Sequence, residues 1–163
     1  MQTFRVKKGQ RVFCTKGLAS MGFGVPATIG ACLAGGRRRT VCVNGDGGFQ
    51  MNIQELATAV SYNVPVKIVI LNNGYLGMVR QWQELFYDRR YSFTELANPD
   101  FGLIARGNGI AYRCVERREE LAGAVAEMKA CKGAYLLEVR VESEENVFPM
   151  VPAGAPVSAI RVE

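Results

Sequence analysis

Histidine is absent from this chain, which excludes several common kinds of active site. Nucleophilic catalysis by a Ser–His or Cys–His pair needs an imidazole base, so neither arrangement is available. The five cysteines contain no CxxC pair and therefore lack the spacing of a zinc site. We interpret them as small, reduced core residues of a protein in a cytosol-like compartment. Any proton chemistry must come from carboxylates, from other side chains or from a bound cofactor.

Long apolar stretches are missing as well. No run reaches the ~18 residues expected of a membrane-spanning helix. Residues 1–8 contain no apolar signal core, so we expect neither contact with a membrane nor secretion. A length of 163 residues with 48% hydrophobic composition is typical of one globular domain with a real core.

The positive charge is modest, at +5, and its most obvious cluster is Arg37-Arg38-Arg39. A nucleic-acid patch is one interpretation, but no stretch alternates basic with aromatic residues as single-strand binders do. The cluster follows Gly35-Gly36, a pattern typical of a helix end, where cations are favoured. We therefore expect no nucleic-acid partner.

The most informative pattern is Gly45-Asp46-Gly47, followed 26 residues after Asp46 by Asn72-Asn73. Each motif ends an apolar, strand-like run, residues 40–44 and residues 66–71. Between them, residues 50–62 have apolar positions at helical spacing. The pattern predicts a strand, a helix and a second strand, with polar side chains at neighbouring strand ends.

Such strand ends are where ligands bind in an open parallel sheet. A lone Asp-Gly pair is also a common turn, but the paired asparagines favour a binding site. One carboxylate, one carboxamide and a nearby backbone carbonyl suit Mg²⁺, whose other ligands are water and substrate phosphates. Glycines at this place allow the backbone to approach a diphosphate closely.

Strand-like and helix-like segments alternate along the chain. This order predicts an α/β fold with three layers, α/β/α, around a mostly parallel sheet. We expect residues 1–142 to form one domain and residues 143–163 to form a C-terminal tail packed on its surface. The predicted strands are 11–15, 40–44, 66–72, 110–115 and 134–141, and the predicted helices are 21–34, 50–62, 76–90, 100–108 and 118–131.

A dinucleotide-binding module is an alternative. Residues 22–27 match G-x-G-x-x-A, and Asp46 lies at about the expected distance for a ribose-binding carboxylate. However, Pro26 is awkward inside that fingerprint, and the glycines around Asp46 favour a loop that binds metal and diphosphate.

Four segments resemble the catalytic subunit of acetolactate synthase, an enzyme that uses thiamine diphosphate (ThDP). The GDG and NN motifs are similar to the ThDP fingerprint in general, and the run Gly77-Met78-Val79-Arg80-Gln81-Trp82-Gln83 favours this family among ThDP enzymes. The resemblance covers nearly the whole chain, and its four segments are residues 17–27, 71–83, 98–101 and 148–155.

This resemblance implies a role for particular residues. Asp46, the side chain of Asn73 and the carbonyl of Tyr75 would hold Mg²⁺. Met21 would form the apolar wedge beneath the thiazolium ring, and Met78 and Trp82 would line the pocket for substrate and for sulfonylurea-type inhibitors. From residue type alone, all three are more often core residues, although a lone tryptophan can also line a pocket. The implied cofactor-binding residues are Met21, Gly45, Gly47, Gly48, Asn73 and Met78.

The resemblance also implies an activity and what this chain lacks for it. The family decarboxylates pyruvate and joins the remaining two-carbon unit to pyruvate or 2-ketobutyrate, in branched-chain amino-acid biosynthesis. Its activating glutamate lies in an N-terminal domain of a partner subunit, and most contacts to FAD lie in a middle domain. We therefore expect no catalytic residue in this chain and no activity from it alone, whether it is an excised piece or half of a split enzyme.

The expected partners are the missing pyrimidine-binding and FAD-binding domains, a second copy in a homodimer or tetramer, and a regulatory subunit. The expected location is the bacterial cytoplasm, or the plastid stroma of a eukaryote. A subunit of another split ThDP-dependent decarboxylase or carboligase is the alternative enzyme.

Overall fold

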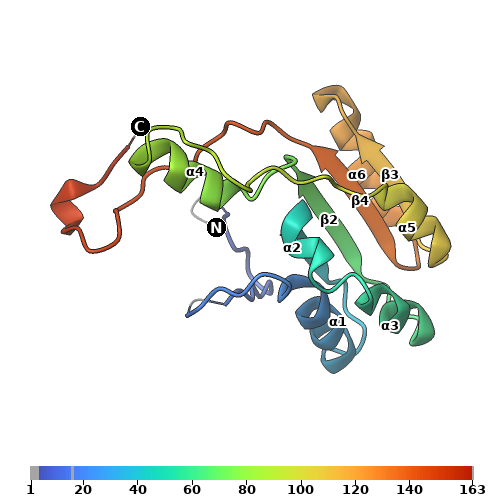
Figure 1. Ribbon diagram of the computed structural model, residues 1–163. Helices are drawn as coiled ribbons and strands as arrows, with labels where there is room; N and C mark the ends of the chain where they lie inside the picture. The colour runs from blue at the N-terminus through green and yellow to red at the C-terminus, as the bar shows by residue number, and fades with distance from the viewer. Residues whose placement is uncertain (1–3, 16, 163) are drawn as a thin grey trace.

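The structure is a computed structural model, and it describes residues 4–15 and 17–162. Its centre is a sheet of four strands, all parallel, in the order β1-β2-β4-β3 (Figure 1). This confirms the predicted α/β fold with a parallel sheet. The strands are β1 (Val41–Gly45), β2 (Lys67–Asn72), β3 (Ala111–Val115) and β4 (Tyr135–Arg140).

Four helices contribute to the main core on one face of the sheet. They bury apolar side chains against alternate strand residues such as Ile68, Ile70 and Leu136, all at most 1% exposed. Residues two apart on a strand share a face, so β2 contributes two of them here. The helices are α1 (Gly24–Ala34), α2 (Asp46–Gln50), α3 (Glu55–Ser61) and α5 (Phe101–Gly107).

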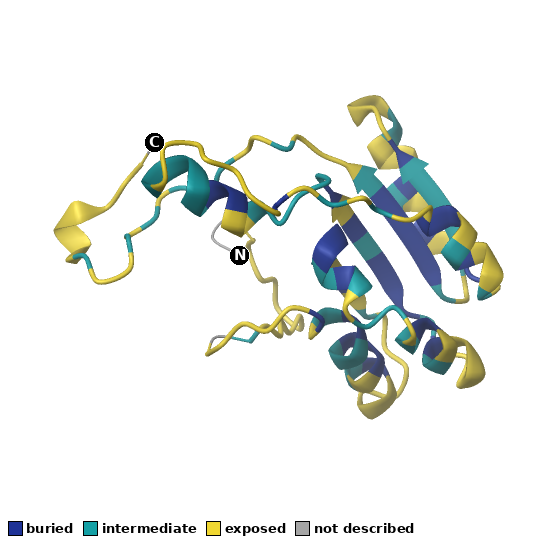
Figure 2. Cartoon of the chain, viewed as in Figure 1, coloured by how far each residue is buried: buried dark blue, intermediate teal, exposed yellow. Residues whose placement is uncertain are grey.

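The opposite face is only partly covered. The short 3-10 helix Arg118–Glu120 leads into α6 (Leu121–Ala130), which packs Ala124 and Met128 against Tyr135 and Leu137. Beyond α6, Val41 and Val43 on β1 are 47% and 63% exposed among the described residues. Figure 2 shows buried segments along the central strands and exposed ones on the outer sides of the helices. The third layer of the predicted α/β/α arrangement therefore covers the β3–β4 half of this face.

The remaining helix, α4 (Gly77–Phe86), lies beyond the carboxyl end of β2 (Figure 1). The C-terminal residues run alongside it, and Gln81 exchanges two hydrogen bonds with the backbone of Val147. The tail is mostly irregular, with a short 3-10 helix at Val157–Ala159 and one bridge between Met150 and Arg161. It contacts α4, while the division of the chain at residue 142 stays a prediction.

Three predicted elements were wrong. Residues 11–15 form no strand, because no neighbouring strand pairs with them and Phe13 is 65% exposed. The helix predicted at 50–62 begins only at Glu55, because the preceding residues form turns with i-to-i+3 hydrogen bonds, such as Glu55 N–H to the carbonyl of Asn52 at 3.1 Å. The helix predicted at 76–90 ends at Phe86, because the backbone turns left-handed at Asp88 and Arg89.

Two other sequence interpretations concern single residue types. Cys32 and Cys42 are buried as expected, and burial raises the pKa of the Cys42 thiol, but Cys14 is exposed and is not a core residue. Arg37 donates from its guanidinium to the carbonyls of Tyr62 and Asn63, just after α3, as a cation at a helix end should. No helix in the described part of the chain is long and apolar enough to cross a bilayer.

Candidate functional site

Asp46 stands at the junction of β1 and α2, at the carboxyl edge of the sheet. It is 1% exposed, and its Oδ2 atom accepts hydrogen bonds from the backbone N–H of Gly74, at 2.9 Å, and from the Nδ2 atom of Asn98, at 2.7 Å. The parallel register, which places Gly45 opposite Leu71, explains why the loop after β2 reaches this carboxylate. The two sequence motifs are therefore in direct contact.

The loop after β2 is held by hydrogen bonds within the loop and by hydrogen bonds to a neighbouring segment. Within it, Asn73 accepts the backbone N–H of Tyr75 on its Oδ1 atom, at 3.1 Å, and Gly74 adopts a φ of 70° that favours glycine. From outside, residues 94–96 pair with it in an antiparallel bridge, with Leu96 N–H donating to the carbonyl of Gly74 at 2.8 Å. Asn73 and Tyr75 therefore lie in a short, constrained loop beside Asp46.

The donor set around this loop matches a hard divalent cation. Asp46 supplies a carboxylate, Asn73 an amide oxygen and Tyr75 a backbone carbonyl. No cluster of three or more His, Cys, Asp or Glu residues that could hold a metal occurs within residues 4–15 and 17–162. One protein carboxylate with neutral oxygens is what Mg²⁺ takes when phosphate and water complete its shell, so these residues fit that ion.

Two glycines at the start of α2 pack so closely against other side chains that a Cβ atom has no room. A Cβ atom added to Gly48 would lie 2.7 Å from the Oδ1 atom of Asn44, and one added to Gly47 would lie 3.3 Å from the terminal methyl of Met21. Met21, which is 50% exposed, thus lies over the start of α2. The amide nitrogen of Asn44 is buried and without a hydrogen-bond partner among the described residues. The structure brings Met21, Gly47 and Gly48 next to Asp46, with Gly45 immediately before it.

A buried hydrogen-bond network supports Asp46, and our sequence reasoning missed it. Asn98 donates to both Asp46 and Asn72, and Asn72 in turn donates its Nδ2 atom to the carboxylate of Glu138, at 2.7 Å. Glu138 is 2% exposed and also accepts from the hydroxyl of Tyr112 at 2.5 Å. Burial and the hydrogen bond to Glu138 raise the pKa of Tyr112 well above its ordinary value. A single carboxylate inside the apolar strand 135–139 was the available signal for this network.

A cleft of about 580 Å³ lies next to the site. Its walls come from the loops that follow β2, β3 and β4, including Asn73 and Tyr75, Glu116, and Arg140. It therefore opens at the carboxyl ends of three parallel strands, where ligands bind in such sheets.

The two residues predicted to line a substrate pocket lie on α4. Trp82 packs its ring against Phe86, with ring centroids 4.8 Å apart, and lines a second hollow of about 450 Å³ with Val79, Gln83, Tyr87 and Arg90. Met78 is 52% exposed, lies one turn before Trp82 and is not part of this wall. The structure thus gives Trp82 a cavity but does not place Met78 in the same one.

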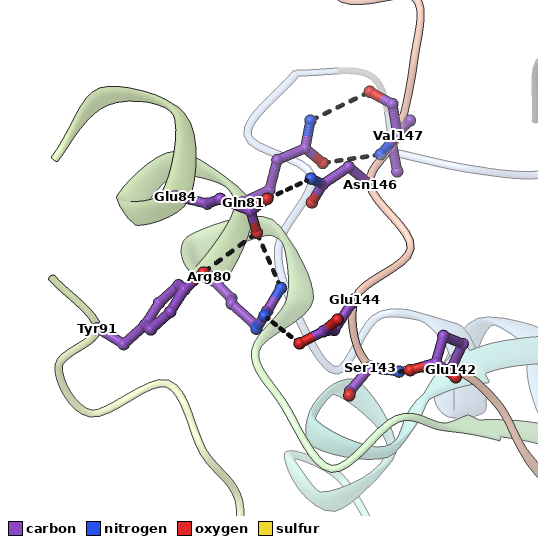
Figure 3. A network of polar contacts seen from close by, with 9 residues as sticks. All are labelled: Arg80, Gln81, Glu84, Tyr91, Glu142, Ser143, Glu144, Asn146 and Val147. Carbon is purple, nitrogen blue, oxygen red and sulfur yellow. Dashed lines mark hydrogen bonds and ion pairs between the residues drawn. The ribbon is translucent and has the colours of Figure 1, made fainter. Parts of the chain in front are cut away.

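Arg80 connects the loop of the site to the C-terminal segment. Its guanidinium lies 5.4 Å from the ring centroid of Tyr75 and pairs with Glu84, at 3.0 Å, and with Glu144, at 3.5 Å. Figure 3 shows these ion pairs beside the two hydrogen bonds that Gln81 and the backbone of Val147 exchange. Arg80 is only 7% exposed, so its guanidinium is enclosed among α4, the C-terminal tail and Tyr75.

Comparison with known proteins gives a consistent result. Residues 1–139 match the family model described as thiamine pyrophosphate enzyme, C-terminal TPP binding domain. The chain is 47% identical over 142 residues to the acetolactate synthase isozyme 2 large subunit of Escherichia coli, covering 86% of this chain and 26% of that protein. It is 45% identical over 151 residues to the mitochondrial acetolactate synthase of Schizosaccharomyces pombe, covering 93% of this chain and 23% of that protein.

A solved structure is similar as well. The thiamine diphosphate-dependent 4-hydroxybenzoylformate decarboxylase of Rhodococcus jostii RHA1 aligns with a TM-score of 0.70 and 33% identity, over 75% of this chain and 23% of that one. The chain thus spans about a quarter of the length of each of these relatives.

Proposed function

This chain belongs to the thiamine pyrophosphate enzyme family, as a C-terminal TPP-binding domain, and on that premise we propose that it forms the metal- and diphosphate-binding part of an acetolactate synthase. Thiamine pyrophosphate and thiamine diphosphate are the same compound. The observation that carries the proposal is the hydrogen bond from Gly74 N–H to Asp46, because it joins the two motifs of the ThDP fingerprint into one site.

The residues have distinct tasks in this proposal. Asp46, the Asn73 side chain and the Tyr75 carbonyl hold Mg²⁺, which in turn binds the diphosphate. Gly45, Gly47 and Gly48 allow the backbone N–H groups at the start of α2 to face the diphosphate, and Met21 supports the ring system from below. When bound, ThDP supplies the electron sink that allows a 2-keto acid to lose carbon dioxide. The residues of this chain bind and orient the cofactor and exclude water from it.

The acetolactate synthase assignment rests on the relatives and on α4. Two relatives with that name are 45% and 47% identical, above the 33% of the decarboxylase from Rhodococcus jostii. The proposed reaction joins pyruvate to pyruvate or 2-ketobutyrate, as a step of branched-chain amino-acid synthesis. Trp82, with its flat ring at the wall of a hollow, is the proposed selector of the second substrate, and Met78 contacts the cofactor.

The rest of the proposed enzyme lies outside these 163 residues. We propose that other domains, which the longer relatives have room for, bind the pyrimidine ring and FAD and provide the activating glutamate. The proposed assembly is a homodimer or tetramer with a regulatory subunit, in the bacterial cytoplasm or the plastid stroma.

The proposal is tested by the metal dependence of ThDP binding in the whole protein that carries this chain. Asp46→Ala should lower the affinity for ThDP in Mg²⁺ by at least about tenfold and remove its dependence on the metal, because no other carboxylate lies in the motif. Asp88→Asn is the control, since its carboxylate is 93% exposed, lies 3.9 Å from Arg90, and asparagine tolerates the left-handed backbone there. Calorimetry that finds the same ThDP affinity of the parent in Mg²⁺ and in a chelator would exclude this site.

A further inference from the structure

Asn98 lies at the centre of the buried network, and its side-chain amide is fully used. Its Nδ2 atom donates to Asp46 Oδ2, at 2.7 Å, and to Asn72 Oδ1, at 3.0 Å. Its Oδ1 atom accepts from the side chain of Gln50, at 2.8 Å. Both N–H groups and the oxygen of this amide therefore have partners, two of them at the ends of α2 and one at the end of β2.

The backbone on both sides of Asn98 is also held. Leu96 is tied to the loop after β2 through its hydrogen bond to Gly74. On the other side, Asp100 caps α5 by accepting the N–H of Leu103 at 2.8 Å, and Pro99 restricts Asn98 to extended backbone. Asn98 is thus set in a short segment between two anchors, with little freedom to move away from Asp46.

The orientation of the amide groups is determined by Glu138. A carboxylate only accepts hydrogen bonds, so Asn72 must turn its Nδ2 atom toward Glu138 and its Oδ1 atom toward Asn98. Asn98 must then present its N–H groups to Asn72, which places the second N–H on Asp46. Through these two amides, the carboxylate of Glu138 determines that an N–H group of Asn98 points at Asp46.

The result is an asymmetric carboxylate at Asp46. Its Oδ2 atom has two donors, Gly74 N–H and Asn98 Nδ2, which occupy both lone pairs of that oxygen. Only Oδ1 remains for a cation, so Asp46 can bind through one oxygen and not through two. Mg²⁺ takes single carboxylate oxygens in a compact octahedron, whereas Ca²⁺ also accepts two oxygens of one carboxylate.

We propose that Asn98 is a positioning residue that sets the metal preference of this site, because it keeps Asp46 monodentate and so favours Mg²⁺ over Ca²⁺. This inference rests on the proposed function, in which Asp46 binds the metal. Without the Asn98 side chain, one lone pair of Oδ2 becomes free for a larger cation. The carboxylate also loses the contact that aims it, which weakens binding of Mg²⁺.

The test is a metal competition in the whole protein that carries this chain, with ThDP present. Mn²⁺ binding is followed by electron paramagnetic resonance, and Mg²⁺ and Ca²⁺ are titrated as competitors. In Asn98→Ala, the affinity for Mg²⁺ should fall by about tenfold while that for Ca²⁺ changes much less, so the Mg²⁺ preference falls by about tenfold. Asn108→Ala is the matched control, because its side chain bonds to the carbonyl of Ile104 in α5, away from Asp46.

A purely structural role would give a different pattern. If both affinities fell by the same factor, or if neither changed, the inference would be overturned although the metal site would stand. If the parent protein bound no Mn²⁺ with ThDP, both this inference and the proposed function would fail. Should Asn98→Ala not fold, Asn98→Leu gives the decision, because leucine keeps most of the side-chain volume but has no N–H group to donate to Asp46. A fall of the Mg²⁺ preference by about threefold supports the inference, and an unchanged preference overturns it.

Discussion

Gly48→Ala should destabilise this domain although alanine is the better helix former. The reason is a collision with Asn44, whose Oδ1 atom would lie 2.7 Å from the new Cβ. Asn44 has little room to retreat, because its Nδ2 atom already lies 3.0 Å from the position that a Cβ on Gly24 would occupy. The side chain is therefore wedged between α1 and α2.

The expected size of the effect follows from these contacts. Forcing one extra carbon into a packed site costs about 1–3 kcal/mol in the free energy of unfolding. The higher helix propensity of alanine over glycine offsets about 0.5–1 kcal/mol of this cost. We expect a net loss of about 1–2 kcal/mol, together with weaker ThDP binding, since α2 carries Asp46 at its first position.

The assay is urea unfolding followed by far-ultraviolet circular dichroism, with two comparisons. Gly123→Ala in α6 is the matched control, because a Cβ there meets no atom within 4 Å, and it should stabilise by about 0.5–1 kcal/mol. Asn44→Ala removes the obstacle, so the double variant Asn44→Ala/Gly48→Ala should recover most of the loss. If Gly48→Ala is as stable as the parent, or if the double variant recovers none of the lost stability, Asn44 is not the obstacle at this position.

Three further results are expected. The 163-residue chain alone should form no acetolactate from pyruvate, because it lacks the activating glutamate of the family, and clear turnover by the purified chain would contradict this. In the whole protein, Trp82→Leu should reduce the preference for 2-ketobutyrate by roughly ten-fold and confer resistance to sulfonylurea-type inhibitors, while ThDP binding stays intact; if both properties persist, Trp82 is ordinary core. Burial lowers the pKa of Lys67 below its ordinary 10.5, so the unfolded chain binds the proton more tightly and the free energy of unfolding should rise as pH increases toward 10.5. Lys67→Met should flatten that rise in urea unfolding at several pH values, and an unchanged slope would refute the assignment.

The elements that could be predicted are those whose pattern is local. The strands at 41–45 and 67–72 lie within short apolar runs that end in glycine or asparagine, and both were predicted to within one residue. Their neighbouring position also followed, because a strand, a helix and a strand in succession form adjacent parallel strands in most α/β proteins. The contact between Asp46 and the loop after Asn73 is a direct consequence.

The elements that could not be predicted depend on partners distant in the chain. The side chain of Asn52, in the turn between α2 and α3, donates to the carbonyl of Gly22, and neither residue indicates the other in the sequence. Residues 11–15 have the composition of a strand, but strand formation needs a neighbour with free hydrogen-bonding groups beside it. The left-handed turn after α4 is likewise invisible in residue type at Asp88 and Arg89.

By itself, the sequence predicted the cofactor class, which the family match supports, from one carboxylate between glycines and two carboxamides at strand ends, and the cation chemistry stays a prediction from the same residues. Only the tertiary structure decided how that carboxylate is presented. Asn98 reaches Asp46 from 52 residues away and Glu138 acts from β4, through Asn72. Hydrogen bonds of this kind depend on distance and direction in space, and the folding of α5, β4 and the loop after β2 around one point is what brings them together.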